Sequence, residues 1–216
     1  MTIIFDLDGT LLNTIDDLGY ACNHALERTG YPTFPIEAYP AKVGNGINNL
    51  IRRALPEAER TEANILKVRA FFVPYYDAHN CDFTRPYEGI PEVLAALKAR
   101  GHQLAVASNK YQAATEKIVN HFFPGMFDTI LGERDGVERK PDPQIVFDIQ
   151  KTLQNQRVLY IGDSLVDRDT AMNADVPFVA CSWGFVPRER LLEAGIKTII
   201  DRPEEILTCL PLCPNN

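Results

Sequence analysis

The feature that most constrains the fold is a regular alternation of short apolar runs and amphipathic stretches after residue 84. The apolar runs are rich in β-branched residues and have the length of buried strands. Between them, hydrophobic residues recur at helical spacing, and Gly or Pro marks the boundaries. This pattern predicts an α/β fold in which helices cover both faces of a parallel sheet. The predicted strands are 2–5, 103–107, 129–131, 157–161, 178–181 and 198–200.

The stretch between the first strand and residue 84 differs, because it shows helical spacing and no strand pattern. Thr14 is expected to cap the first helix, since an acidic residue follows at the third helical position. Pro74 predicts a bend or break in the last helix. A linker at 84–89 leads back to the sheet. The predicted helices are 15–30, 47–55 and 61–79, and the predicted domains are an α/β core (1–13 and 84–216) and an inserted all-helical domain (14–83).

The composition is that of an ordinary globular protein, and a net charge of -7 disfavours nucleic acid as a partner. No apolar run is long enough to span a membrane, and a strand that starts at residue 2 leaves no room for a signal peptide. We therefore expect a cytoplasmic protein without a membrane partner. The five cysteines are scattered, which favours free thiols over a disulfide framework. Cys209 and Cys213 are close together, but they lack the second ligand pair of a zinc site.

Two carboxylates, Asp6 and Asp8, follow the first strand directly, and Gly9 allows a tight turn there. Acids so close together at the end of a buried strand are costly to ionise without a cation nearby. Parallel sheets bind ligands beyond the carboxyl ends of their strands, so polar groups after neighbouring strands would face one crevice. These groups are Asp6 and Asp8, Ser108 and Asn109, and Asp163 and Asp167.

The chemistry of this set matches phosphoryl transfer. Asp6, Asp8 and Asp163 offer oxygen ligands, which suit Mg²⁺, and Lys140 would offset their repulsion of a phosphate. One carboxylate can be the nucleophile and the other the general acid/base. Taken singly, the same residues have ordinary explanations: solvated acids in a turn, an N-capping cluster at Asp163 and Asp167, and a surface lysine.

Four motifs, in this order, resemble those of the haloacid dehalogenase-like (HAD) hydrolase superfamily. They are Asp6-Leu7-Asp8-Gly9-Thr10-Leu11, Ser108-Asn109, Lys140-Pro141 and Gly162-Asp163-Ser164-Leu165-Val166-Asp167. The resemblance covers nearly the whole chain and implies a Rossmann-like parallel sheet with helices on both faces. Residues 14–83 look like the small helical cap domain that these enzymes insert after the first strand.

The resemblance also implies a role for each matching residue. Asp6 would be the nucleophile and a Mg²⁺ ligand, and Asp8 would be the general acid/base with its backbone carbonyl on the metal. Ser108 and Lys140 would bind the phosphoryl group, and Asp163 would ligate Mg²⁺. Thr10 would be a supporting residue, as would Asp167, which would ligate the metal or steady Lys140. From its amide donors, Asn109 is expected to bind the phosphate together with Ser108 and Lys140.

Two weaker similarities suggest the substrate. The loop Val43-Gly44-Asn45-Gly46 and the linker 84–89 resemble those of phosphoglycolate phosphatase-like enzymes. Gly44, Asn45 and Gly46 are therefore a candidate substrate loop, and the expected partner is a small phosphorylated metabolite such as phosphoglycolate or a sugar phosphate. A monomer or dimer is expected. A phosphosugar mutase with the same site, or a non-catalytic metabolite-binding protein on the same fold, remain alternatives.

Overall fold

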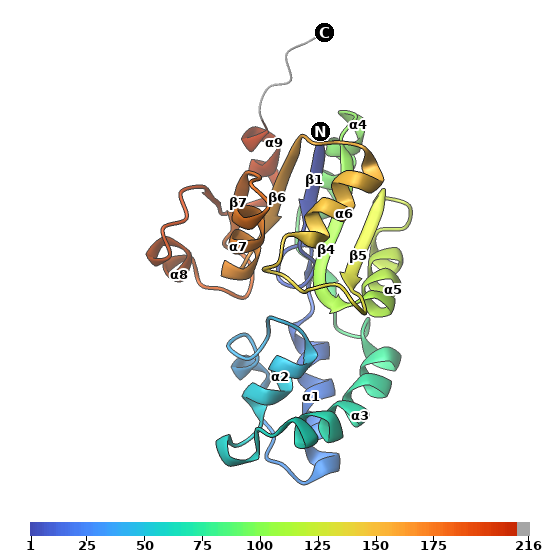
Figure 1. Cartoon of the computed structure of the whole chain (residues 1–216), viewed down its shortest axis with the longest axis vertical. Coiled ribbons are helices and arrows are strands. Elements are labelled where there is room, and N and C mark those ends of the chain that lie inside the picture. Colours follow the sequence, from blue (N-terminus) through green and yellow to red (C-terminus); the bar gives the residue numbers. More distant parts are fainter. Residues whose placement is uncertain (211–216) are drawn as a thin grey trace.

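The computed structural model describes residues 1–210, and at their centre lies a six-stranded parallel sheet (Figure 1). The strand order is β5-β4-β1-β6-β7-β8, so β1 lies between β4 and β6. The predicted α/β fold is confirmed. The strands are β1 (Thr2–Phe5), β4 (Gln103–Tyr111), β5 (Thr129–Glu133), β6 (Val158–Gly162), β7 (Phe178–Cys181) and β8 (Ile199–Ile200).

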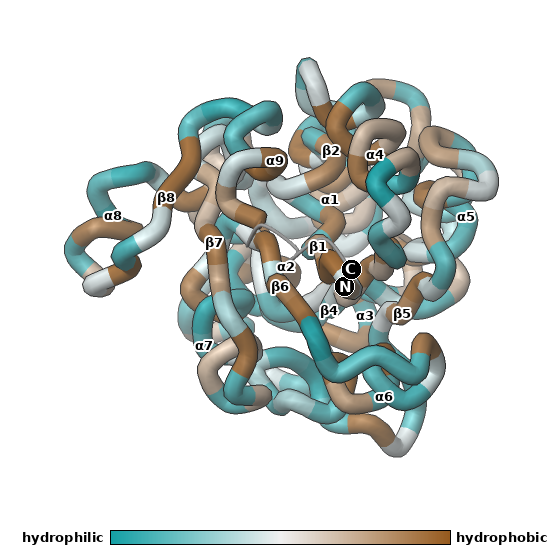
Figure 2. Tube along the Cα trace, turned by 90° about the horizontal axis from the view of Figure 1, so that it is seen from above, coloured by the Kyte–Doolittle hydropathy of each residue, from teal (hydrophilic) through white to brown (hydrophobic). Residues whose placement is uncertain are grey.

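Alternate side chains of β1 enter two hydrophobic cores on opposite faces of the sheet. Ile3 and Phe5 pack in the core that contains α4 and α5, whereas Ile4 packs with α6 and α7. Burial on both faces explains why the strands are continuously apolar, and Figure 2 shows hydrophobic residues in the strands at the centre of the molecule. The helices around the sheet are α4 (Ile90–Ala99), α5 (Gln112–Phe122), α6 (Gln144–Leu153), α7 (Leu165–Asn173), α8 (Arg188–Glu193), the 3₁₀ turn η3 (Pro203–Glu205) and α9 (Ile206–Cys209).

The helical segment, residues 14–83, lies beyond the carboxyl ends of the strands, at the bottom of Figure 1. Its hydrophobic side chains are continuous with the core on the α4 and α5 face of the sheet. Burial of Leu18, Cys22 and Leu26 on α1, and of Val68 and Phe72 on α3, joins these two helices. The elements of the segment are α1 (Ile15–Thr29), η1 (Ile36–Ala38), α2 (Ile47–Ala54), η2 (Glu57–Glu59) and α3 (Glu62–His79).

Two short strands connect the helical segment to the sheet. β2 (Leu12–Asn13) and β3 (Arg85–Pro86) pair in antiparallel fashion, so the outgoing and returning chains lie side by side. The buried carboxylate of Asp17 accepts hydrogen bonds from the backbone N–H of Phe83 and from the backbone and hydroxyl of Thr84. The beginning of α1 is thereby fixed to the returning chain.

Two local predictions were wrong, and a third was wrong in part. Thr14 makes no side-chain cap on α1, because its hydroxyl donates to Asp8 Oδ1 over 2.7 Å instead. Pro74 does not break α3, which continues to His79 with Phe72 and Tyr76 buried on either side of Pro74. A bend at Pro74 stays a prediction. β4 does not end at Ala107 but runs to Tyr111, so Ser108 lies within the strand.

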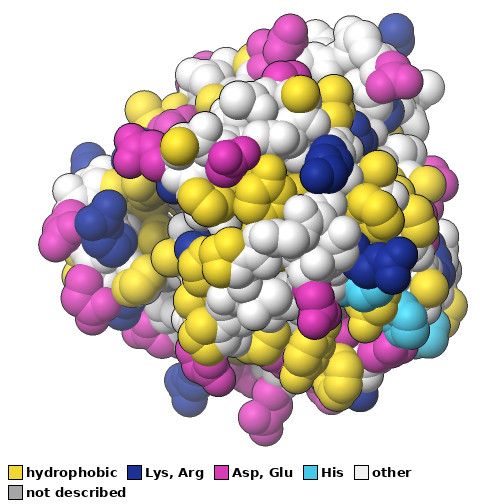
Figure 3. All heavy atoms as spheres, turned by 90° about the horizontal axis from the view of Figure 1, so that it is seen from below, with side chains coloured by type: hydrophobic (Ala, Val, Ile, Leu, Met, Phe, Trp, Pro, Cys, Tyr) yellow, Lys and Arg dark blue, Asp and Glu magenta, His cyan; other side chains and the backbone are white. Residues whose placement is uncertain are grey.

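The surface of the helical segment opposite the sheet exposes hydrophobic side chains among charged ones (Figure 3). Tyr20 on α1, Leu66 and Phe71 on α3, and Phe83 after it are all exposed. Among residues 1–210, no helix has both the length and the apolar character needed to cross a membrane. The oligomeric state stays a prediction.

Candidate active site

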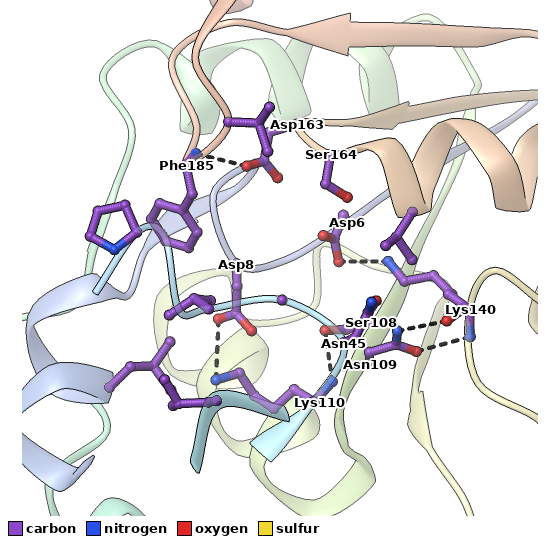
Figure 4. A pocket seen from close by; sticks show the side chains of 18 of the residues that line it. Asp6, Asp8, Asn45, Ser108, Asn109, Lys110, Lys140, Asp163, Ser164 and Phe185 are labelled. Atoms are coloured by element: carbon purple, nitrogen blue, oxygen red, sulfur yellow. Dashed lines mark hydrogen bonds and ion pairs between the residues drawn. The ribbon is translucent and has the colours of Figure 1, made fainter. Parts of the chain in front are cut away.

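The candidate site occupies the carboxyl edge of β4, β1 and β6, facing the helical segment. Phe5 of β1 is in register with Val106 of β4 and Ile161 of β6, so the residues that follow each of them lie at similar height. A cavity of about 580 Å³ lies there, and residues from both the sheet edge and the helical segment line it (Figure 4). The structure brings these predicted residues together around it: Asp6, Asp8, Ser108, Asn109, Lys140 and Asp163.

Lys140 is the cation at the centre of the sheet edge. Its buried Nζ lies 2.9 Å from Asp6 Oδ1 and 2.7 Å from Asp167 Oδ1, and it donates to the carbonyl of Ala107 and the hydroxyl of Tyr160. Burial alone would lower the pKa of Lys140, but the charges of Asp167 and Asp6 raise it well above its usual range. Lys140 is therefore a permanent cation that holds Asp6 and Asp167 on either side.

Three buried carboxylates form a cluster around this edge. Oxygens of Asp6, Asp163 and Asp167 all lie within 4.8 Å of one another. Burial, followed by the charge of Asp167, raises the pKa of Asp6 well above its ordinary value and that of Asp163 to about 7. One lysine thus offsets only part of the charge of three acids. Oxygen ligands crowded in this way fit a hard divalent cation, so Asp6 and Asp163 are suited to hold one.

Asp163 is fixed tightly from several sides. Its carboxylate accepts hydrogen bonds from the hydroxyl of Thr10 over 3.1 Å and from the backbone N–H of Phe185 over 2.8 Å. Gly9, at a φ of 87°, and Gly184 pack so closely that a Cβ on either would overlap Asp163. These glycines allow the backbone to approach a carboxylate where no other residue fits.

Asp167 serves Lys140 and the start of α7. Its Oδ1 accepts the 2.7 Å bond from Lys140, and its Oδ2 accepts from both the backbone and the hydroxyl of Ser164. Ser164 in turn caps α7 in a capping box. Of the two roles expected for Asp167, the geometry favours the one that steadies Lys140.

Ser108 and Asn109 differ in what their side chains are free to do. The Ser108 hydroxyl lines the cavity and accepts a hydrogen bond from the backbone N–H of Lys110. The Asn109 amide donates to the carbonyl of Lys140 and accepts from its N–H, each over 3.0 Å. Asn109 therefore holds the Lys140 loop against β4 and uses one of its two amide N–H donors to do so.

Asp8 lies at the boundary with the helical segment. Its Oδ1 accepts from Thr14 over 2.7 Å and forms an ion pair with Lys110 Nζ over 3.1 Å. Its side chain is 18% exposed, against 13% for that of Asp6. Asp6 and Asp8 thus differ in environment although they are two residues apart.

The candidate substrate loop lines the opposite wall of the cavity. Gly44, Asn45 and Gly46 all have positive φ, at 108°, 62° and 82°, and Figure 4 shows Asn45 beside Ser108 and Asn109. Arg53 of α2 donates from Nη1 to the carbonyls of residues 42, 43 and 44, each within 3.0 Å. Asn49 of α2 also donates, to the carbonyl of Asn45 over 2.8 Å, so two side chains of this helix hold the shape of the loop.

The sequence was also compared with known protein families and proteins. The family model of haloacid dehalogenase-like hydrolases matches residues 3–181. The chain belongs to this family. It is 31% identical over 214 residues to a phosphoglycolate phosphatase of Cereibacter sphaeroides, covering 95% of this chain and 96% of that one. A phosphoglycolate phosphatase of Aquifex aeolicus is 31% identical over 187 residues and covers 85% of each.

A solved structure agrees with these relatives. A protein of Lactobacillus delbrueckii subsp. bulgaricus, assigned as a phosphoglycolate phosphatase, has a TM-score of 0.91 and 35% sequence identity and covers 95% of each chain. This HAD-like hydrolase is accordingly a phosphoric monoester hydrolase.

Lys110 and Tyr76 line the cavity of this HAD-like hydrolase but were not among its predicted site residues. Lys110 directly follows the second motif, which was a usable signal, but it was predicted to lie beyond a strand that in fact includes it. No sequence pattern marked Tyr76 as a site residue, because its helical spacing is that of any core residue.

Of the two neighbouring cysteines near the end of the chain, Cys209 is a free thiol, and Cys213 lies outside the described residues.

Proposed function

We propose that this chain is a Mg²⁺-dependent phosphatase that hydrolyses a small, phosphoglycolate-like or sugar phosphate monoester through an aspartyl-phosphate on Asp6. The observation that carries the proposal is the Asp6 carboxylate, which directly follows β1, lies 2.9 Å from Lys140 and lines the cavity. Burial and the charge of Asp167 raise the pKa of Asp6, whereas Lys140 lowers it, and a bound cation would further favour the ionised, nucleophilic carboxylate. Bound Mg²⁺ would supply charge neutralisation for the phosphoryl oxygens, with Asp6 and Asp163 as side-chain ligands and the Asp8 carbonyl as a third.

The residues divide the reaction into two displacements. In the first, an Asp6 oxygen bonds to phosphorus while the ester P–O bond breaks, and Asp8 gives its proton to the departing alcohol oxygen. In the second, Asp8 takes a proton from water, whose oxygen attacks phosphorus and breaks the bond to Asp6. Ser108 and Lys140 bind the phosphoryl oxygens throughout, and Lys140 offsets the charge that builds on them.

We further propose that residues 14–83 are a cap domain over a core of residues 1–13 and 84–216. The cavity wall from the helical segment combines apolar Ile47 and Leu50 with Arg53, whereas the phosphoryl-binding groups come from the sheet edge. The choice of alcohol group is therefore assigned to the cap, with Gly44, Asn45 and Gly46 as its substrate loop. The names of the relatives make phosphoglycolate the first substrate to test.

The test is the release of inorganic phosphate from a panel of small phosphate esters, with Mg²⁺ and after its removal by EDTA. We expect release that requires Mg²⁺ and is highest for phosphoglycolate or a sugar phosphate. Rapid quenching with a labelled ester should trap phosphate on Asp6. Interconversion of sugar phosphates without release of free phosphate would replace the phosphatase with a mutase. No turnover of any ester would overturn the proposed reaction altogether.

A further inference from the structure

Lys110 is a buried cation on β4 that the proposed reaction does not use. Its side chain is 4% exposed, yet it belongs to the wall of the cavity. The Nζ atom forms the 3.1 Å ion pair with Asp8 Oδ1, donates to the Tyr76 hydroxyl over 2.5 Å, and lies 4.5 Å from the centre of the Tyr76 ring. Figure 4 shows the side chain extended toward Asp8. Lys110 therefore joins the sheet edge, the residue proposed as acid/base, and α3.

The two bonds to Asp8 fall on the same oxygen. Oδ1 receives both Lys110 and Thr14, whereas within residues 1–210 no hydrogen bond or ion pair reaches Oδ2. Two donors on one oxygen fix the rotation of the carboxylate and leave its other oxygen free. An acid/base needs this arrangement, because one oxygen must carry the transferred proton in a defined direction.

The end of α3 is held to the same part of the core by other side chains. The Tyr111 hydroxyl donates to the Asp77 carboxylate, and Lys117 Nζ donates to the Asp77 carbonyl. Lys110 binds Tyr76, the neighbour of Asp77. Tyr111 and Lys117 thus hold α3 against the core, and Lys110 couples that contact to Asp8.

We propose that Lys110 is a positioning residue, which together with Tyr76 of α3 orients Asp8 for proton transfer to the leaving alcohol. The proposal rests on the proposed phosphatase reaction and adds a residue to it. Its consequence is that proton transfer is efficient only while α3 sits against β4.

The test compares leaving groups in Lys110→Met, which keeps most of the length of the side chain and removes the charge. An alkyl ester needs a proton on its leaving oxygen, whereas p-nitrophenol leaves without one. For phosphoglycolate and for ethyl phosphate, we expect kcat/KM to fall by about 10²-fold, the typical cost of misplacing a catalytic group. For p-nitrophenyl phosphate, the fall should be less than about 5-fold, since kcat/KM reports only steps through the loss of the leaving group.

Matched variants separate positioning from the mere docking of α3. Lys117→Met removes a lysine contact to the same end of α3 without touching Asp8, so it should lower all three kcat/KM values by the same small factor. Tyr76→Phe keeps the contact of Lys110 with Asp8 but removes the hydroxyl that holds Lys110, and it should reduce alkyl esters selectively, by about 10-fold. Lys110→Arg keeps the positive charge, so it should lose less kcat/KM on the alkyl esters than Lys110→Met does. Thermal unfolding checks that each variant is folded.

Several results would overturn the proposal. An equal loss on alkyl and aryl esters in Lys110→Met would mean that the lysine acts on structure alone. A loss confined to phosphoglycolate, with ethyl phosphate unaffected, would make Lys110 a contact for the substrate carboxylate. If Lys110→Met does not fold, Tyr76→Phe decides the question. An equal loss of kcat/KM on alkyl and aryl esters in Tyr76→Phe would then refute the positioning role of Lys110. Wild-type protein inactive on all three esters would instead refute the proposed function.

Discussion

The two walls of the cavity are built on different principles. At the sheet edge, Asp6, Lys140 and Asp163 are at most 9% exposed, and each is held by charged or backbone partners from segments far apart in the sequence. On the helical wall, the loop around Asn45 is partly exposed and keeps its shape through bonds from Arg53 to backbone carbonyls. A rigid polar wall opposite a more adaptable one suits an enzyme whose chemistry is constant and whose substrate choice varies. Four experiments can break or sharpen this contrast.

The largest effect is expected from Asp6→Asn at the sheet edge. Loss of the nucleophile should lower kcat by more than about 10³-fold, measured as phosphate release. The fold should persist, because an amide relieves the repulsion between Asp6 and its buried acidic neighbours. Asp8→Asn should be nearly as damaging, although it leaves the attacking group in place. Asp6→Asn with activity comparable to the wild type would remove Asp6 from its proposed role.

The second effect concerns stability at the same edge. Lys140→Met leaves the buried carboxylates of Asp6 and Asp167 without their cation, and it should reduce the free energy of unfolding by about 3–5 kcal/mol, measured in urea. Lys98→Met is the matched control, since Lys98 pairs with Asp128 at the surface, where both side chains are about one-third exposed. It should cost less than about 1 kcal/mol. Similar losses in both variants would contradict the contrast between a buried and an exposed pair.

The third effect is a coupling between pH and Mg²⁺. Burial raises the folded-state pKa of Asp163 to about 7, whereas an unfolded aspartate titrates near 4. The folded metal-free protein thus retains a proton that the unfolded chain lacks, so this group's contribution to stability is lost as pH rises from about 4 through 7.

Because Mg²⁺ binds the deprotonated carboxylates, it should raise the Tm more at pH 8 than at pH 5. At the higher pH, the free energy of unfolding should rise by about 3 kcal/mol when the metal is present at a hundred times its Kd. Thermal unfolding with and without EDTA provides the measurement. Asp163→Asn should weaken both the pH dependence and the response to Mg²⁺. An equal Mg²⁺ shift at both pH values would argue against a metal held by these acids.

The smallest effect is expected on the helical wall. Arg53→Met removes the donor that holds the carbonyls of residues 42–44, so the loop should become looser. We expect KM for the preferred ester to rise about 5-fold, equivalent to roughly 1 kcal/mol, with kcat changed less than about 2-fold. Arg52→Met on the adjacent exposed position is the control, and steady-state kinetics on the ester panel is the measurement. A large loss of kcat in Arg53→Met would show that this wall takes part in the chemistry.

Much of the sheet edge was predictable, because local pattern determines where strands end and which residues follow. Asp6, Ser108 and Asp163 each come directly after an apolar run or within its last residues, so a parallel sheet had to present them on one side. The helical wall was harder to predict, since helical spacing identifies a buried face but not what that face contacts. Thr14 shows the difference: its sequence context is that of a helix cap, yet the nearby Asp8 carboxylate competes successfully for its hydroxyl.

The sequence by itself determined the α/β class, the helical character of residues 14–83 and the presence of a group of acids, a lysine and neutral donors suited to a phosphate. These properties follow from periodicity and side-chain chemistry, which are local. Only the tertiary structure decided that β1 lies between β4 and β6, that burial raises the pKa of Asp163, and that Lys110 joins Asp8 to Tyr76. Those outcomes depend on packing between segments far apart in the chain. Local sequence patterns do not encode such packing.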